Sequence, residues 1–359
     1  MKVLIINTVP FRNNGMSAII LDYYKQLKND FQFDFVINEF LEEHFLRRIG
    51  YDSKLFFLPN RKKKLPKYII ELRRIVKEND YDLIHIHGNS SLMAIELFAC
   101  SRMLDTKKIV HCHGSQSDYG MLEKLTRNYF FKNYDKAITV ELEKSYLFSG
   151  KQHEVLLNGI EVEKFKFSLK NRNEIRKMFG LKNEKILLHI GRMNRQKNQS
   201  FLLKVFKEYL KINPQSCLFL IGDGPLKEDI KKEIKFLNLE KQVKLIGLVS
   251  NAEEWYSAAD IFLLPSTFEP FGLVAVEAQV NGLPCVFSEN VSEQVQVSNE
   301  VSFLPINSDN IPKWSEKITQ VTSRQRPKYQ NETDERLFKY DIKQAAKRLK
   351  KIYFESFND

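Results

Sequence analysis

Residues 262–287 read FLLPSTFEPFGLVAVEAQVNGLPCVF, and the residue types along this stretch predict a strand, a loop, a helix and a second strand. The first apolar run ends at Pro265, and apolar residues then recur at helical spacing up to Asn281 and Gly282, a pair typical of a left-handed helix end. A strand, a helix and a further strand in succession are typical of parallel α/β sheets. The stretch therefore predicts this fold class.

The start of the helix in this stretch predicts an anion site. The backbone N–H groups of Gly272, Leu273 and Val274 lack helical acceptors there, and the helix dipole favours a negative charge at the same place. Glu269 precedes these groups, and Glu277 lies within the helix. Carboxylates repel phosphate but accept hydrogen bonds from sugar and ribose hydroxyls. The combination indicates a nucleotide sugar.

Length and composition predict a soluble, cytoplasmic protein of two domains. The chain has 359 residues, whereas single cores stop growing at about 250–300 residues. Apolar residues make up 43% and charged residues 28%, as in globular proteins. The four cysteines lie in apolar segments without paired spacing, which indicates buried thiols in a reducing compartment. The N-terminal apolar run is too short for a signal peptide, and no apolar window is long enough to cross a bilayer.

The net charge of +11 indicates an anionic partner. Nucleic acid is not expected, because the basic residues are dispersed and no recognition motif is present. A basic run at 61–64 precedes a helix that begins near Pro66, with three aromatic residues upstream, Phe45, Phe56 and Phe57. This combination suits contact with anionic lipid at the inner face of the cell membrane, and the alternative is an ordinary surface helix.

Strands and helices alternate in both halves of the chain, which predicts two doubly wound, Rossmann-like sheets. Strands are expected at 2–7, 31–38, 54–59, 82–88, 107–114, 136–140, 154–158, 184–191, 216–224, 242–247, 260–266, 283–287 and 301–306. Helices are expected at 17–28, 198–212, 225–238, 251–258, 271–281 and 337–357. The polar stretch 160–173 is the expected linker, which places the N-terminal domain at 1–165 and the C-terminal domain at 166–336.

Two basic residues in GRMNRQKN (191–198) are candidates for binding a diphosphate. Arg192 and Lys197 lie between a strand and a helix, at the sheet edge where such folds bind ligands. A guanidinium group offers a planar fork to phosphate oxygens, and an ammonium group offers a mobile charge. The alternative for these residues is a solvated basic loop.

Two further glycines lie at strand-to-helix junctions. GDGP (222–225) resembles a dinucleotide fingerprint in which Lys227 replaces the third glycine, and this argues against an NAD-dependent oxidoreductase. Gly222 either lines a nucleotide-base pocket or only begins a helix. Gly15 either lets backbone amides approach a phosphate or is only part of a turn.

Four histidines lie at expected strand ends, His85, His87, His111 and His113. Alternate residues of a strand share a face, so each pair has the spacing of two metal ligands. A zinc site would need another ligand, which the sequence does not locate. His113 is the preferred site residue because it ends its strand and polar residues follow it at 115–118, whereas the earlier histidine of each pair is expected to point into helix packing.

These motifs together resemble the family-4 retaining glycosyltransferases of the GT-B fold. The resemblance rests on FEPFGLVAVEAQ (268–279), GRMNRQKN (191–198), LNGIEVEKF (157–165), HCHG (111–114) and the Asn14–Gly15 loop, and it spans nearly the whole chain in the expected order. It implies two Rossmann-like domains that face a central cleft. It also implies a C-terminal helix, within 337–359, that crosses back to the N-terminal domain.

The resemblance implies a role for each candidate residue. The catalytic set is Arg192 and Lys197 on the donor diphosphate, Glu269 on the donor-sugar hydroxyls, and His113 beside the reacting sugar. The donor-binding set comprises Gly15, Gly222, Gly272, Leu273, Val274 and Glu277, the last of which would bind the ribose. Asn198 departs from the family, which often has glycine there.

No metal or cofactor is expected, because members of this family work without a metal. The sequence does contain Asp80 and Asp82 at the spacing of a metal-binding DxD motif, but the pair precedes a strand and so predicts a helix-to-strand connection.

The implied activity is that of a retaining hexosyl-type glycosyltransferase (EC 2.4). The sugar would pass from a nucleotide diphosphate, preferably UDP, to a saccharide acceptor, with a lipid-linked acceptor favoured, in capsule or exopolysaccharide biosynthesis. No enzymic nucleophile is evident, so front-face attack is expected. The alternatives are a non-catalytic nucleotide-sugar-binding protein and an NAD-dependent oxidoreductase.

Overall fold

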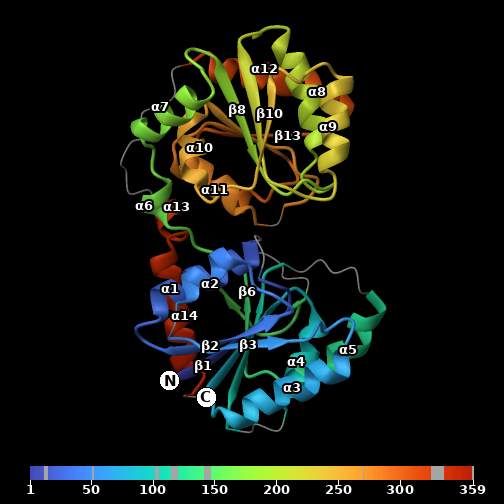
Figure 1. The fold of residues 1–359 in the computed structure, drawn as a ribbon, viewed down its shortest axis with the longest axis vertical. Coiled ribbons are helices and arrows are strands. Elements are labelled where there is room, and N and C mark those ends of the chain that lie inside the picture. The colour runs from blue at the N-terminus through green and yellow to red at the C-terminus, as the bar shows by residue number, and fades with distance from the viewer. Residues whose placement is uncertain are drawn as a thin grey trace. The chain divides into compact units, whose positions relative to one another are not determined.

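The protein consists of two compact units, and Figure 1 shows each as a sheet flanked by helices. The first unit joins residues 1–160 to residues 339–359, and the second comprises residues 161–338. The computed structural model describes residues 1–11, 15–50, 52–101, 105–114, 120–140, 147–269, 271–324 and 335–357. Asn14, Pro270 of the FEPFGLVAVEAQ motif and the polar residues 115–118 lie outside the described residues.

The first unit contains a seven-stranded parallel sheet in the order β3-β2-β1-β4-β5-β6-β7. Its strands are β1 (Lys2–Asn7), β2 (Gln32–Asn38), β3 (Leu55–Leu58), β4 (Leu83–Gly88), β5 (Lys107–Cys112), β6 (Lys136–Thr139) and β7 (Glu154–Val155). Every strand expected in this half is present. The regular alternation of apolar strands and helices therefore predicted the sheet correctly.

Helices cover both faces of this sheet. They are α1 (Gly15–Leu27), α2 (Glu43–Ile49), α3 (Leu65–Glu78), α4 (Ala94–Ala99), α5 (Gly120–Lys132) and α14 (Ile342–Glu355), with a 3-10 turn η1 (Ser91–Met93). One face packs against α1, α2 and α14, and the other against α3, α4 and α5. Successive strand residues point to opposite faces, so Val3 and Ile5 join the first cluster while Leu4 and Ile6 join the second.

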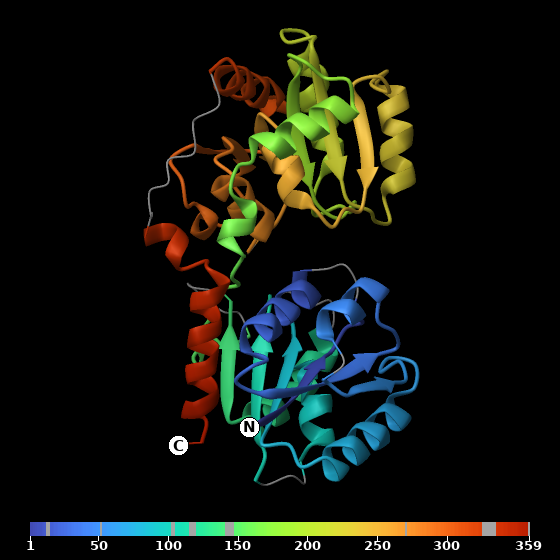
Figure 2. The ribbon, with the colours of Figure 1, turned by 60° about the vertical axis from the view of Figure 1, so that its left-hand side comes forward.

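The last helix, α14, belongs to the first unit, as the resemblance implied. Figure 2 shows it in red beside the sheet of that unit, and its Leu349 and Ile352 are buried in the same cluster as α1. The helix starts later than expected because the Asp341 side chain accepts a hydrogen bond from the Lys343 N–H group, 2.8 Å away, and caps it. Gly159 has no room for a side chain, since a Cβ there would lie 2.5 Å from the Ile342 Cα atom.

The second unit contains a six-stranded parallel sheet in the order β10-β9-β8-β11-β12-β13. Its strands are β8 (Lys185–Ile190), β9 (Ser216–Ile221), β10 (Val243–Gly247), β11 (Ile261–Leu264), β12 (Cys285–Ser288) and β13 (Val301–Leu304). The order reverses between β8 and β11, and loops at the carboxyl ends of strands beside such a switch point commonly bind ligands.

Helices also cover both faces of the second sheet. They are α6 (Val162–Phe165), α7 (Leu169–Met178), α8 (Gln199–Leu210), α9 (Lys227–Phe236), α10 (Ala252–Ala258), α11 (Leu273–Val280), α12 (Ile311–Thr322) and α13 (Glu335–Phe338), with 3-10 turns η2 (Glu293–Val295) and η3 (Ser308–Asn310). Helices α8, α9 and α12 pack on one face. On the other, Tyr256 of α10 contacts Phe262 of β11. The polar stretch 160–173, expected to be a linker, contains α6 and the start of α7.

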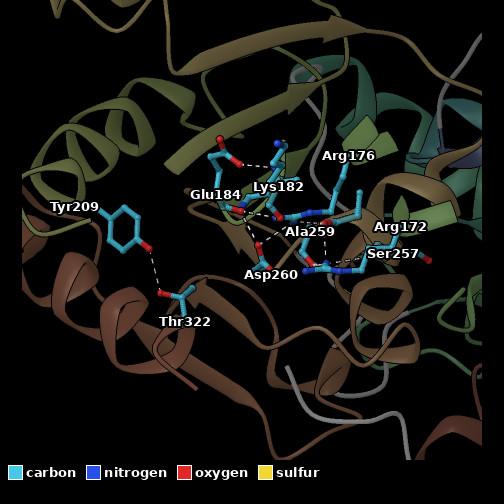
Figure 3. Close-up of polar contacts among 11 residues, drawn as sticks. Arg172, Arg176, Lys182, Glu184, Tyr209, Ser257, Ala259, Asp260 and Thr322 are labelled. Carbon is cyan, nitrogen blue, oxygen red and sulfur yellow. Dashed lines mark hydrogen bonds and ion pairs between the residues drawn. The ribbon is translucent and has the colours of Figure 1, made fainter. Parts of the chain in front are cut away.

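A partly buried ionic network ties α7 to the amino ends of two strands (Figure 3). The carboxylate of Asp260 lies 2.6 Å from Arg172 and 3.4 Å from Arg176, and it accepts a hydrogen bond of 2.8 Å from the Ile186 N–H group. Arg176 also donates to the Glu184 carbonyl at 2.6 Å. The network lies at the end of β11 opposite the ligand-binding edge, so its role is to hold the sheet together.

Some of the residues that were expected to contact lipid are buried in the first unit or contact buried residues there. Arg61 lies 3.3 Å from the fully buried carboxylate of Glu96. Phe45 is 2% exposed and Phe56 packs against the core, while Phe57 is 60% exposed. The expected contact with lipid is therefore wrong for Phe45, whereas Phe56 is half-buried and Phe57 is exposed. None of the helices in the described ranges has both the length and the apolar character that a bilayer span requires.

Candidate functional site

The loop after β11 leads into α11, which begins where the sequence predicted a helix start. Gly272 is the N-cap residue of α11, and no side chain in the described part of the chain caps the helix there. At the other end Gly282 has a φ of 73°, and the Leu283 N–H group donates to the Ala278 carbonyl at 3.0 Å, so the expected left-handed end is confirmed. The first-turn N–H groups of α11, which include those of Leu273, therefore have no side-chain cap and can serve an anion.

The backbone holds Glu269 in place on both sides. Its N–H group donates to the Asn290 carbonyl at 3.1 Å, and its own carbonyl accepts from the Ser292 N–H group at 3.0 Å. The residue is 7% exposed. Gly272 packs against its side chain so closely that a Cβ there would lie 2.9 Å from the Glu269 Cγ atom. The glycine therefore serves close packing as well as the helix start.

Lys197 and Glu269 form an ion pair, so the structure brings together two residues that lie far apart in the sequence. Their side chains are 15% and 9% exposed, and the Ser266 hydroxyl donates to the same carboxylate at 3.4 Å. A lysine ammonium group carries three donors. Lys197 can therefore keep this contact and still donate to a further anion.

The loop that carries Lys197 leaves the carboxyl end of β8. The Lys197 N–H group donates to the Asn194 side chain at 3.0 Å, which closes a tight turn. Arg192 in the same loop is exposed. Asn198 has a φ of 53°, in the left-handed region that glycine and asparagine tolerate best. The asparagine at this position is therefore compatible with the backbone that a glycine would adopt.

His189 is a buried residue of β8, the strand that this loop follows, and it was not predicted from the sequence. Its Nδ1 atom lies 2.9 Å from the Leu263 carbonyl of β11, and its Nε2 atom lies 3.2 Å from the Gln199 side chain. Burial lowers the pKa of His189 to about 4, with the nearby charge of Lys197 as a further cause. The residue is therefore neutral at pH 7. A polar residue within the apolar run of β8 was the signal in the sequence.

Gly222 follows β9 and packs closely against the neighbouring loop, which follows β8. It has a φ of 135°, and a Cβ there would lie 2.1 Å from the Gly191 carbonyl oxygen. The Met193 N–H group donates to the Asp223 carbonyl at 3.0 Å. Gly222 therefore sets the position of the Arg192 loop, and this packing role explains the glycine without a dinucleotide fingerprint.

A residue of α10 orients Glu277. The hydroxyl of Tyr256 donates to the Glu277 carboxylate at 2.8 Å and lies 3.3 Å from the Val274 carbonyl. Burial raises the pKa of Tyr256 well above its ordinary value, and the charge of Glu277 adds to the effect. The phenol therefore stays protonated and donates. Nothing in the sequence connects Tyr256 to α11, because the contact depends on how the two helices pack.

Gly15 and His113 lie in the first unit, whereas the other expected site residues lie in the second. Gly15 begins α1, and a Cβ there would meet no atom of the described residues within 4 Å. His113 follows β5, and its Nε2 atom lies 2.9 Å from the His87 Nδ1 atom. Burial lowers the pKa of His113 to about 3, so the ring is neutral at pH 7.

The Asp80–Asp82 pair lies at the amino end of β4, as the sequence predicted. The Asp82 carboxylate accepts a hydrogen bond of 2.6 Å from the Lys2 N–H group, and Asp80 has a φ of 45° in the turn before the strand. These contacts account for the pair as a helix-to-strand connection. The four cysteines are buried, and none of them forms a disulfide within the described residues.

Two family models match consecutive parts of the chain. The model for Glycosyltransferase Family 4 matches residues 13–164, and the model for Glycosyl transferases group 1 matches residues 171–344. The matches cover nearly all of both units in the order expected from the motifs. This chain belongs to the family-4 glycosyltransferases of the GT-B fold.

Curated relatives of this glycosyltransferase match most of its length. The UDP-Gal:α-D-GlcNAc-diphosphoundecaprenol α-1,3-galactosyltransferase of Escherichia coli is 27% identical over 348 residues, covering 89% of this chain and 88% of the relative. The capsular polysaccharide biosynthesis glycosyltransferase CapH of Staphylococcus aureus is 26% identical over 299 residues, covering 78% of this chain and 79% of the relative.

Solved structures share the fold of the glycosyltransferase. HepE of Anabaena in complex with UDP-glucose superimposes with a TM-score of 0.78 at 18% identity, covering 99% of this chain and all of that one. At this identity the likeness shows the fold alone. It agrees with the two parallel α/β sheets described above.

Proposed function

We propose that this glycosyltransferase transfers a sugar from a nucleotide-diphosphate donor, with UDP as the preferred carrier, to a lipid-linked saccharide during assembly of a bacterial surface polysaccharide. The name of the E. coli relative combines a UDP-sugar with a diphosphoundecaprenol-linked acceptor, and that of CapH refers to capsular polysaccharide. The observation that carries the donor assignment is the Lys197–Glu269 ion pair next to the uncapped start of α11.

The second unit supplies groups for each part of such a donor. Lys197 and the exposed Arg192 would bind the diphosphate, together with the first N–H groups of α11. Glu269, held by its backbone contacts, would accept hydrogen bonds from the sugar hydroxyls. Glu277 would accept them from the ribose, in the orientation set by Tyr256.

The chemistry follows from where negative charge develops. The acceptor hydroxyl oxygen bonds to the anomeric carbon as the bond from that carbon to the phosphate oxygen breaks, and the electron pair leaves with the nucleotide diphosphate. Arg192, Lys197 and the α11 N–H groups would stabilise this growing charge. The leaving phosphate oxygen takes the acceptor proton on the same face of the sugar. The anomeric configuration is retained, and no metal ion is required at the donor.

The first unit would provide the acceptor side. We place His113 next to the reacting sugar, where its neutral imidazole would form a hydrogen bond with a hydroxyl group. Gly15 at the start of α1 leaves open space in which backbone amides would approach the donor phosphate. Neither assignment depends on the ion pair of the second unit.

Variants of the second unit test donor turnover. Lys197→Ala should lower kcat about 10²- to 10³-fold, the loss typical of one group that stabilises charge in the transition state. Glu277→Ala should weaken donor binding. The measurement is release of the nucleotide from a panel of nucleotide sugars, first without and then with candidate acceptors.

Lys204→Ala is the matched control for Lys197→Ala, because Lys204 is an exposed lysine on the neighbouring helix α8. It should turn over donor at the wild-type rate. Folded Lys197→Ala and Glu277→Ala proteins with full activity would remove the proposed site. Donor binding without turnover under every acceptor would favour a non-catalytic nucleotide-sugar-binding protein.

The stereochemistry has its own test. NMR of the newly formed glycosidic linkage reports the anomeric configuration of the product. Retention supports front-face attack by the acceptor. An inverted product would require a general base on the opposite face and would contradict this mechanism.

Contact with the cytoplasmic face of the membrane is part of the proposal. The exposed lysines at 62–64 would meet anionic headgroups, whereas Arg61 is engaged with Glu96. Sedimentation with vesicles of phosphatidylglycerol should carry the protein down at low salt, and vesicles of phosphatidylcholine should not. Equal sedimentation with both would contradict an electrostatic contact.

A further inference from the structure

Four histidines gather on one face of the first sheet. The register pairs His87 of β4 with His111 of β5, and the period of two along each strand adds His85 and His113 to the same face. The rings lie close to one another, with centroids 4.0 Å apart for His85 and His87 and 4.2 Å apart for His111 and His113. The sequence spacing had shown two separate pairs, and the sheet register makes them one cluster.

Several ring nitrogens of this cluster are buried without a partner. His85 and His111 are 0% exposed and His87 is 2% exposed. The Nε2 atom of His85 and both ring nitrogens of His111 have no hydrogen-bond partner among the described residues. Buried polar atoms in proteins are nearly always satisfied by protein, water or an ion. The cluster therefore has the properties of an unfilled ligand set.

A tyrosine of the C-terminal helix orients one of the imidazoles. The hydroxyl of Tyr353 in α14 lies 2.7 Å from the His85 Nδ1 atom, which leaves Nε2 as the free ligand atom. Metal-binding histidines commonly have such a partner on the second ring nitrogen.

The space beside the cluster has the size of a single water molecule or ion. A cavity of about 10 Å³ is lined by His85 and His87, but not by His111, and by tyrosines and apolar side chains. The ligand atoms of His85, His87 and His111 all lie within 4.8 Å of one another. A tetrahedral zinc ion with Zn–N bonds of about 2.0–2.1 Å holds its ligand nitrogens about 3.4 Å apart, so the rings would have to move closer together to hold the ion.

We propose that His85, His87 and His111 bind one divalent transition-metal ion of the zinc class, with a water molecule from the cavity in the fourth position. Three neutral imidazoles and no carboxylate in the set select zinc, copper, nickel or cobalt over magnesium and calcium. The ion is structural. It joins β4 and β5 to each other, and through Tyr353 it couples the two strands to the C-terminal helix α14.

The metal has one consequence for the candidate site. The Nδ1 atom of His87 lies 2.9 Å from the Nε2 atom of His113. An ion on the other nitrogen of His87 would hold this ring, and with it the orientation of His113. His113 itself is not a ligand, so the ion would affect sugar transfer only through the orientation of His113.

Titration of the tag-free, full-length protein with Co²⁺, after treatment with a chelator, tests the proposal. We expect one equivalent to bind with the visible absorption of tetrahedral cobalt, and Zn²⁺ to displace it. The double variant H85Q/H111Q should lose this absorption. H153Q is the control, because the His153 Nδ1 atom is engaged with the Lys151 carbonyl at 2.8 Å, outside the cluster.

Tyr353→Phe gives a second measurement that does not remove a ligand. Loss of the hydroxyl should weaken metal binding about 10- to 100-fold, as for other partners of metal-bound histidines. Wild-type protein that binds no cobalt would show that the cluster holds only water and would overturn the proposal. Equal binding by wild type and H85Q/H111Q, or loss of binding in H153Q, would overturn it as well.

Discussion

At the scale of single residues, Tyr256 and His189 show that the candidate site depends on groups outside its motifs. Tyr256 holds the carboxylate of Glu277, and His189 connects the Lys197 loop to β11. Both residues are buried and both act through another residue. They are positioning residues, and each leads to a measurable expectation.

Tyr256→Phe should raise the KM for the donor about 10-fold or more with little change in kcat. The reason is that a hydrogen bond to a charged group contributes about 1.5–3 kcal/mol, while the phenylalanine ring preserves the packing against Phe262. Steady-state kinetics with the best donor is the measurement. Tyr209→Phe, which removes the hydroxyl that contacts Thr322 on the other face of the sheet, is the control and should leave KM unchanged.

His189 should make the second unit sensitive to acid. Its pKa is about 4 in the folded protein and about 6.5 in the unfolded chain, so the unfolded state binds more protons between these values. The free energy of unfolding is therefore highest above pH 6.5 and falls as the pH decreases, by about 1.4 kcal/mol for each pH unit. Urea unfolding at pH 7, 6 and 5 should show a weaker pH dependence for His189→Gln. An identical dependence in both proteins would contradict this account.

The residues of the site differ in how far the sequence could predict them. Glu269 and Lys197 lie next to strand ends and turn residues, so their place at the edge of a sheet follows from the local pattern. Their ion pair does not, because it joins positions on separate strands. The reason why position 222 requires glycine can be seen only in the structure, where the residue closely approaches the Gly191 carbonyl.

At the scale of secondary-structure elements, α7 illustrates how one helix depends on a single carboxylate. Arg172 and Arg176 project from α7 to Asp260 at the start of β11, and Arg172 also donates to the carbonyls of 257–259 (Figure 3). The helix has little apolar surface of its own, with Ile175 as its buried apolar residue. The ionic network therefore fixes the position of α7 on the sheet.

Asp260→Ala should destabilise the second unit by about 3–5 kcal/mol. Removal of the carboxylate leaves two partly buried arginines without a counter-charge. Glu174→Ala is the matched control on α7, since the Glu174–Lys170 pair is exposed and 3.9 Å long, and its loss should cost no more than about 0.5 kcal/mol. Chemical unfolding followed by circular dichroism compares the two. Equal effects would mean that the network contributes no more than a surface pair.

At the scale of the whole molecule, the chain returns to its first unit after completing the second. Helix α14 buries Leu349, Ile352 and Tyr353 against the face of the sheet that α1 also covers. The amphipathic pattern of the tail predicted a helix, and the family resemblance assigned it to the first unit. The packing explains why, because the face that receives it is apolar.

Leu349→Ala should destabilise the first unit by about 2–5 kcal/mol, because Leu349 is 1% exposed and its truncation leaves a cavity. Lys347→Ala on the exposed side of the same helix should change stability by less than about 0.5 kcal/mol. A protein of two units need not unfold in one step. Hydrogen exchange of the first-unit strands is therefore the measurement, and unchanged protection in Leu349→Ala would contradict the role of α14.

The sequence by itself determined the two parallel sheets, the strand-to-helix loops and the family, because strand periodicity, turn residues and helix ends are local properties of the chain. It also placed Glu269, Arg192 and Lys197 in strand-to-helix loops and Glu277 within a helix. Only the tertiary structure decided which of these residues meet. The pairing of Lys197 with Glu269, and the gathering of four histidines beside α14, depend on sheet register and helix packing, which join positions distant in the chain.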